Sequence, residues 1–157
     1  MRRKDREITD PAKIGQILRR CQVCRLGLRD GERVYVVPVN FGLVEREGKR
    51  ILYFHGAKEG KKLELIEKNS HAAFAMSCGH QLIPGKVDCA TTFQYRSVCG
   101  RGEMRMVEGD ERMQALTCIM KHFDSEGEHP FTEKHAAAVS IFRMDVEQFT
   151  GKRRIAK

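Results

Sequence analysis

Short apolar and β-branched runs dominate the hydrophobic pattern of the chain and predict a protein built mainly from strands. Strands are expected over residues 25–28, 33–39, 51–54, 72–77, 89–107 and 138–146. Pro38 lacks a backbone donor, so it places the second of these runs at a bulge or at a sheet edge. The longest run is expected to bend near Gly100 and Gly102.

Apolar residues at helical spacing predict two main helices, over residues 11–21 and 110–124. Asp10 followed by Pro11 is the N-cap and first-turn pair expected at the start of the first helix. A polar hairpin turn is expected at 45–50, a loop at 79–88 and a surface excursion at 125–135. Strands and helices do not alternate, which favours a mainly β fold, an antiparallel β-barrel with helices packed outside it.

The turn after the predicted strand 51–54 combines His55, Gly56, Gly60, Lys61 and Lys62. A short helical pattern follows it. Unpaired N–H groups at a helix N-terminus, together with lysine charge, form a site that suits a phosphate group. The turn therefore points to a phosphorylated cofactor. The alternative is an ordinary solvent-exposed turn between a strand and a helix.

Two common nucleotide motifs do not fit the glycines of the chain. A P-loop needs four residues between its glycines and a hydroxyl after its lysine, whereas three residues separate Gly56 from Gly60 and Lys62 stands in the hydroxyl position. A dinucleotide fingerprint at Gly100 and Gly102 would need a third glycine where Arg105 stands. ATP, GTP and a Rossmann-bound nicotinamide are therefore poor candidates for the resident ligand.

Length and composition predict one domain over residues 1–157, with a mass of 18.0 kDa. No apolar run approaches the length of a membrane span, and no signal-peptide pattern follows the first residues, so no membrane partner is expected. Six cysteines without a secretory signal are most simply reduced thiols, which predicts a cytoplasmic protein.

The net charge of +8 is concentrated near the two ends of the chain. Two basic tails are expected, residues 1–6 with +3 and residues 152–157 with +4, which leaves +1 for the rest. Because no basic helix or aromatic-and-basic stripe crosses the body, no specific nucleic-acid partner is expected.

Cys21 and Cys24 have the spacing of half a zinc site or of a redox pair. No second pair of this spacing exists in the sequence, and Cys21 also fits the apolar face of the first predicted helix. We therefore expect no metal site and interpret these thiols as core residues.

Five segments in order resemble one known family over nearly the whole length. They are MRRKDREITD at 1–10, YVVPVNFG at 35–42, YFHGAKEGKKL at 53–63, YRSVCGRG at 95–102 and FTGKR at 149–153. The chain resembles the pyridoxamine 5'-phosphate oxidase-like FMN-binding split barrels, and within them the nitroimidazole-resistance (Nim) proteins. The resemblance implies a split barrel and a homodimer with FMN in a groove between the subunits.

Positions that match the family motifs imply a cofactor site. His55, Lys61 and Lys62 would bind the FMN phosphate, and Ser97 would touch the flavin from a strand paired across the dimer. The segment that would run along the isoalloxazine, with its backbone groups meeting the polar ring edge, consists of Val36, Val37, Pro38, Val39 and Asn40.

The resemblance also implies a function, an FMN-dependent reductase of nitroimidazole and other nitroaromatic compounds. A small-molecule electron acceptor would be reduced from nitro group to amine, with His71 as the candidate residue on the substrate side. The alternative for His71 is an exposed histidine at a strand start. Oxidation of pyridoxamine phosphate is not expected, because that signature contains tryptophan and the chain has none. The alternative function is a non-catalytic flavin- or haem-binding protein for storage or redox sensing, and some relatives of this fold bind a deazaflavin.

Overall fold

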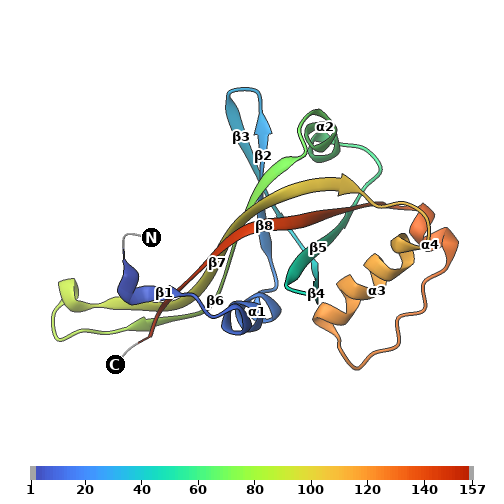
Figure 1. Cartoon of the computed structure of the whole chain (residues 1–157). Coiled ribbons are helices and arrows are strands. Elements are labelled where there is room, and N and C mark those ends of the chain that lie inside the picture. The colour runs from blue at the N-terminus through green and yellow to red at the C-terminus, as the bar shows by residue number, and fades with distance from the viewer. Residues whose placement is uncertain (1–2, 156–157) are drawn as a thin grey trace.

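The structure is a computed structural model that describes residues 3–155, and one antiparallel sheet dominates it (Figure 1). Its strands are β1 (Glu7–Ile8), β2 (Cys24–Asp30), β3 (Arg33–Val39), β4 (Gly42–Arg46), β5 (Lys49–Gly56), β6 (His71–Ile83), β7 (Thr92–Met106) and β8 (Ser140–Arg154). They follow the order β3-β2-β6-β7-β8-β5-β4, and β1 pairs with β8. The outer strands β3 and β4 do not pair with each other, so the sheet curls without closing.

Helices flank this sheet, which confirms the expectation of a mainly β split barrel with flanking helices. The longer ones are α1 (Pro11–Arg20), α2 (Lys61–Lys68) and α3 (Glu111–Phe123), and the short ones are η1 (Lys4–Arg6), η2 (Asp88–Ala90) and α4 (Glu133–Ala137). The Asp10 carboxylate accepts a hydrogen bond from the Ala12 N–H at 2.9 Å, which confirms the predicted N-cap of α1. Among residues 3–155, no helix is long and apolar enough to cross a membrane.

Two hydrophobic clusters form the core. The larger lies inside the curled sheet, where the Phe54 and Phe142 rings stack with centroids 5.4 Å apart. The smaller lies between the sheet and α3 and includes Tyr53 and Ile119. Gly42 is required at this second contact, because a Cβ there would lie 2.7 Å from backbone atoms of α3.

Arg50 connects four parts of the fold although only 7% of its surface is exposed. Its guanidinium donates to Glu45 Oε1 and to the Pro11 carbonyl, each at 2.7 Å, and lies 4.3 Å from the centroid of the Phe149 ring. These contacts tie β5 to β4, to the start of α1 and to β8.

The prediction of a loop at 79–88 is wrong, because β6 continues to Ile83. Its end pairs with β7 in a long two-stranded arm that projects from the body (Figure 1). Gly79 has φ of +64°, and the β6–β7 register shifts between Cys78 and Gln81. A glycine bulge of this kind bends a strand without ending it. Only the tip of the arm is turn.

The last strand is longer than predicted, since β8 runs from Ser140 to Arg154 instead of ending at 146. The expected basic tail 152–157 is therefore partly strand, with Lys152 paired to Glu7 of β1. In the other expected tail, 1–6, residues 4–6 form η1. Residues 1, 2, 156 and 157 lie outside the described part of the chain. The excursion 125–135 includes the start of α4.

Candidate functional site

The predicted phosphate turn lies between β5, which ends at Gly56, and α2, which begins at Lys61. Gly60 is the N-cap, and its φ of +128° is a backbone conformation that L side chains rarely adopt. The Leu63 and Glu64 N–H groups donate to the Gly60 carbonyl. Helix geometry leaves the N–H groups at the very start of α2 without intrahelical partners.

The Lys62 side chain folds back over the end of β5. Its Nζ lies 5.0 Å from the centroid of the Phe142 ring, and a Cβ at Gly56 would be only 2.7 Å from it. Lys62 is half-buried and forms no hydrogen bond or ion pair with any residue from 3 to 155. Burial lowers its pKa. The ammonium therefore lacks a counter-ion among the described residues.

His55 lies beside this ammonium at the end of β5. Its pKa is lowered from the usual histidine value, first by partial loss of hydration and second by the Lys62 charge. Both groups are therefore destabilised in their charged forms. An anion between them would reverse both shifts, so His55, Gly56 and Lys62 are together a candidate anion site.

The Lys61 side chain points away from His55, toward the β2–β3 hairpin. Its Nζ lies 2.5 Å from Asp30 Oδ2 and 5.4 Å from the centroid of the Tyr35 ring. The hydrogen bond to Asp30 raises the Lys61 pKa. The two lysines predicted as a phosphate-binding pair thus differ, since Lys61 holds α2 against the β2–β3 hairpin and Lys62 is unpaired.

The segment predicted to run along the isoalloxazine is β3 and the residue after it. Among the described strands, β3 lies at one end of the sheet and pairs only with β2, so the position predicted from Pro38 is a sheet edge. Val36 is 60% exposed on the outer face with Pro38, whereas Val37 and Val39 pack against the core. Asn40 donates a side-chain hydrogen bond to the Gln22 carbonyl at 3.3 Å. The outer face and the free edge of β3 remain available to a ligand or partner.

His71 opens β6 and lines the same outer face as β3. A cavity of about 580 Å³ there is lined by Gly27, Leu28, Arg29, Val34, His71, Ala72, Ala73, Arg101, Gly102 and Glu147. The His71 N–H donates to Asn69 Oδ1 at 2.9 Å, which fixes the start of the strand. The structure therefore places the predicted substrate-side histidine in a concave surface that also includes an edge valine.

Sequence reasoning missed the residues that make this surface concave. Gly27, Ala73 and Arg101 are register partners on β2, β6 and β7, so their side chains share one face. Two of the three are small, and the sheet surface is hollow there. Only the pairing of the strands shows that these three residues are neighbours, because they are far apart in the sequence.

Ser97 lies far from the anion site within one chain. His55 pairs with Ile141 of β8, whereas Ser97 pairs with Lys152 of the same strand. The two positions on β8 are eleven residues apart, and at about 3.3 Å per residue this is roughly 36 Å of strand. One chain brings together His55, Gly56 and Lys62 but not Ser97.

Cys21 and Cys24 are buried in the larger hydrophobic cluster, in agreement with their interpretation as core residues. Burial raises the pKa of each thiol to about 12. Within residues 3–155 there is no group of three or more His, Cys, Asp or Glu side chains that could hold a metal ion.

Comparison with known proteins identifies relatives of the whole fold. A protein-family model described as pyridoxamine 5'-phosphate oxidase matches residues 10–153. The structure is similar to that of a candidate 5-nitroimidazole antibiotic resistance protein from Bacteroides thetaiotaomicron, with 30% identity and a TM-score of 0.80. The alignment covers 94% of this chain and 86% of that one. No match was found among curated proteins.

More distant structures share the fold alone. An FAD- and haem-binding protein from Mycobacterium smegmatis has 17% identity and a TM-score of 0.82, over 96% of this chain and 74% of that one. An FAD-binding protein from Mesorhizobium loti has 21% identity and a TM-score of 0.67, over 96% of this chain and 98% of that one. The resemblance to split-barrel and nitroimidazole-resistance proteins is thereby confirmed.

Proposed function

The chain belongs to the pyridoxamine 5'-phosphate oxidase family, and from this premise we propose that it is an FMN-dependent reductase of nitroaromatic small molecules. The candidate nitroimidazole resistance protein, at 30% identity, supports the substrate class. Relatives described as flavin-binding support the cofactor class. The observation that carries the proposal is the unpaired Lys62 ammonium beside His55.

The anion site fits the phosphate of FMN. Lys62 supplies a charge without a counter-ion, Gly56 supplies the space for it, and the first N–H groups of α2 supply donors. The flavin itself would supply the redox chemistry, which is the transfer of electrons to an acceptor. The chain would hold the phosphate at Lys62 and offer the edge of β3 to the ring.

Reduction of a nitro group to an amine consumes six electrons and six protons and releases two molecules of water. The acceptor would have to remain bound, or to bind again, through three successive two-electron reductions. The outer-face cavity with His71 would hold such an acceptor beside β3. His71 would act there as a proton donor or hydrogen-bonding group to the reduced nitro oxygens.

The test is reoxidation of the reduced flavoprotein under anaerobic conditions. FMN-loaded protein, reduced by dithionite and then freed of excess dithionite, should be reoxidised faster by 2-methyl-5-nitroimidazole than in buffer alone. With the reduced protein in at least threefold excess over the nitro compound, which supplies the six electrons, the amine should be found by mass spectrometry. Reoxidation no faster than in buffer would contradict the reductase and leave a flavin-binding protein.

Replacing His71 by asparagine should slow this reoxidation by about 100-fold, the lower range for loss of a general acid. Flavin content should be unchanged, because His71 lies outside the anion site. The measurement is stopped-flow flavin absorbance with His80→Asn, an exposed histidine on the arm, as the control. Equal rates for wild type and His71→Asn would exclude a role for His71 in the reaction.

A homodimer with the flavin site at the subunit interface is part of the proposal. If Ser97 touches a flavin whose phosphate is bound at Lys62, the separation along β8 requires Ser97 to come from a second copy. Exposed valines on the β3 edge support this arrangement, because an uncovered apolar edge strand promotes association.

Replacing Val36 by glutamate should therefore convert the dimer to a monomer and reduce bound FMN, because a carboxylate would be buried without a partner. We expect the dissociation constant of the dimer to rise at least about 100-fold, measured by analytical ultracentrifugation. Val23→Glu, at an exposed valine outside the sheet, is the control. A dimeric Val36→Glu protein with full flavin would contradict the proposal.

The affinity for FMN should rise as the pH falls from 8.0 to 6.5. The pKa of His55 is lowered in the free protein, and a bound phosphate would raise it, so binding takes up a proton. The gain is at most about tenfold per pH unit for one linked proton. Fluorescence titration of FMN into wild type and His55→Gln tests this, and the dependence should be weaker in His55→Gln. An equal dependence would exclude His55 as the linked group.

A further inference from the structure

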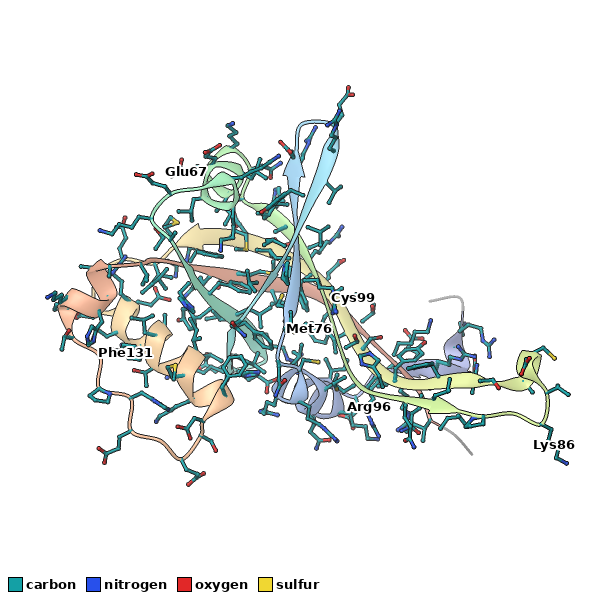
Figure 2. The ribbon with its side chains drawn as sticks, turned by 180° about the vertical axis from the view of Figure 1, so that it is seen from behind. Glu67, Met76, Lys86, Arg96, Cys99 and Phe131 are labelled. Atoms are coloured by element: carbon teal, nitrogen blue, oxygen red, sulfur yellow. The ribbon has the colours of Figure 1, made fainter. Side chains whose placement is uncertain are left out.

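A second concave surface lies where α1, β7 and β8 meet at the base of the β6–β7 arm. It is a hollow of about 240 Å³ lined by Ile8, Lys13, Gln16, Ile17, Arg20, Arg96 and Arg153. Figure 2 shows Arg96 where the arm leaves the body, beside α1. Four of the seven lining residues are cationic and none is acidic.

Three of these cations have no counter-ion among residues 3–155. Arg20, Arg96 and Arg153 form no hydrogen bond or ion pair within the described residues, and only Lys13 has a partner, Asp10 Oδ2 at 3.5 Å. The end of α1 places a partial negative charge near Arg20, but this compensates at most part of one charge.

The strand register brings two of these guanidinium groups together. Arg96 and Arg153 are direct partners in the antiparallel β7–β8 ladder, so both side chains project from the same face. Like charges directly opposite each other destabilise a sheet. An anion bound between them would remove this repulsion, and the planar guanidinium fork matches the geometry of phosphate oxygens.

A larger hollow of about 720 Å³ adjoins the first and shares Arg153 with it. Its other lining residues are Arg3, Asp5, Arg6, Ile83, Thr92, Arg154 and Ile155. Its one carboxylate, Asp5, is bound by Arg3 at 2.7 Å. The cationic surface therefore extends beyond the smaller hollow into a space that also offers apolar side chains.

We propose that the hollow around Arg20, Arg96 and Arg153 binds the diphosphate group of a small anion, either inorganic pyrophosphate or a nucleoside diphosphate. Its volume of about 240 Å³ leaves room for a group of the size of a diphosphate. This site is separate from the Lys62 site within the chain, because Arg153 lies twelve residues along β8 from Ile141, the partner of His55.

Isothermal titration calorimetry on FMN-loaded protein tests the proposal with two probes, inorganic pyrophosphate and ADP, in 150 mM salt. The variant Arg96→Gln/Arg153→Gln should bind both probes at least tenfold more weakly than wild type, with its FMN content unchanged. The control Arg46→Gln/Lys49→Gln removes the same charge from the exposed β4–β5 hairpin and should bind like wild type. Without a probe, Arg96→Gln/Arg153→Gln should also melt at a higher temperature than wild type, because cross-strand repulsion is removed.

The two probes distinguish the source of the phosphate groups. Tighter binding of ADP than of pyrophosphate would assign the adjoining hollow to the nucleoside, and equal binding would assign the site to the diphosphate alone. Equal weakening in both variants would mean general charge attraction and would overturn the proposal. Binding of a single-stranded oligonucleotide in the absence of any binding of either probe would overturn it in favour of a nucleic-acid surface.

Discussion

Replacing Lys62 by methionine should weaken FMN binding by about 10- to 100-fold and leave the protein folded. A hydrogen bond to a charged group contributes about 1.5–3 kcal/mol, and each 1.4 kcal/mol is a factor of ten in affinity. Methionine is unbranched like lysine, and the change removes the ammonium together with its contact to the Phe142 ring. Fluorescence titration of FMN into the flavin-free protein measures the change.

Lys61→Met is the matched control, because it changes the net charge by the same amount at the neighbouring position. Lys61 is already paired with Asp30, so its loss should affect FMN binding less than the loss of Lys62. Equal affinities for Lys62→Met and wild type would place the phosphate elsewhere. Equal losses in the two variants would contradict the separate roles of the two lysines.

The flavin-free Lys62→Met protein should be at least as stable as the wild type at pH 7. Because burial lowers the pKa of Lys62, the unfolded chain holds this proton more tightly than the folded protein does. The charged ammonium therefore destabilises the folded protein until a phosphate binds. Urea unfolding of both flavin-free proteins tests this sign, and a clear loss of stability would mean that Lys62 has a structural role.

Replacing Arg50 by methionine should lower the free energy of unfolding by about 3 kcal/mol or more, because two hydrogen bonds of a buried charged group are lost and each contributes about 1.5–3 kcal/mol. The change removes the hydrogen bonds to Glu45 and to the Pro11 carbonyl and the contact with the Phe149 ring. These contacts connect β5 with α1, β4 and β8, so the variant loses that connection. Urea denaturation followed by far-UV circular dichroism gives the value.

Arg19→Met is the matched control for this effect. Arg19 binds the same Glu45 carboxylate, but from the exposed end of α1. Exposed ion pairs contribute about 0–1 kcal/mol, so its loss should be small. A loss below about 1 kcal/mol for Arg50→Met, or equal losses for both variants, would contradict the central role given to Arg50 in the fold.

Local signals predicted much of the fold. The Asp10–Pro11 cap fixed the start of α1, and the apolar positions of 110–124 predicted α3 within one residue at each end. The edge position of β3 followed from Pro38, whose ring removes a backbone donor. The residues from 51 to 62 also predicted a strand, a turn and a helix start at Lys61 and Lys62, because that geometry is set within a short segment.

Long-range contacts explain what the sequence could not predict. Gly79, Pro84 and Gly85 indicate a loop locally, but the β6–β7 ladder continues past the bulge at Gly79 because each strand supplies the other's hydrogen bonds. The cavity around His71 depends on the register of β2, β6 and β7, and the different directions of Lys61 and Lys62 depend on Asp30 and Phe142. None of these partners is near in sequence.

The visible absorption spectrum of the purified protein, with the released chromophore identified by mass after denaturation, tests the proposed flavin site most directly. We expect a flavin spectrum, a released mass equal to that of FMN, and a lower flavin content in Lys62→Met than in the wild type. A haem spectrum, or no chromophore together with no uptake of added FMN, would contradict the proposed flavin site.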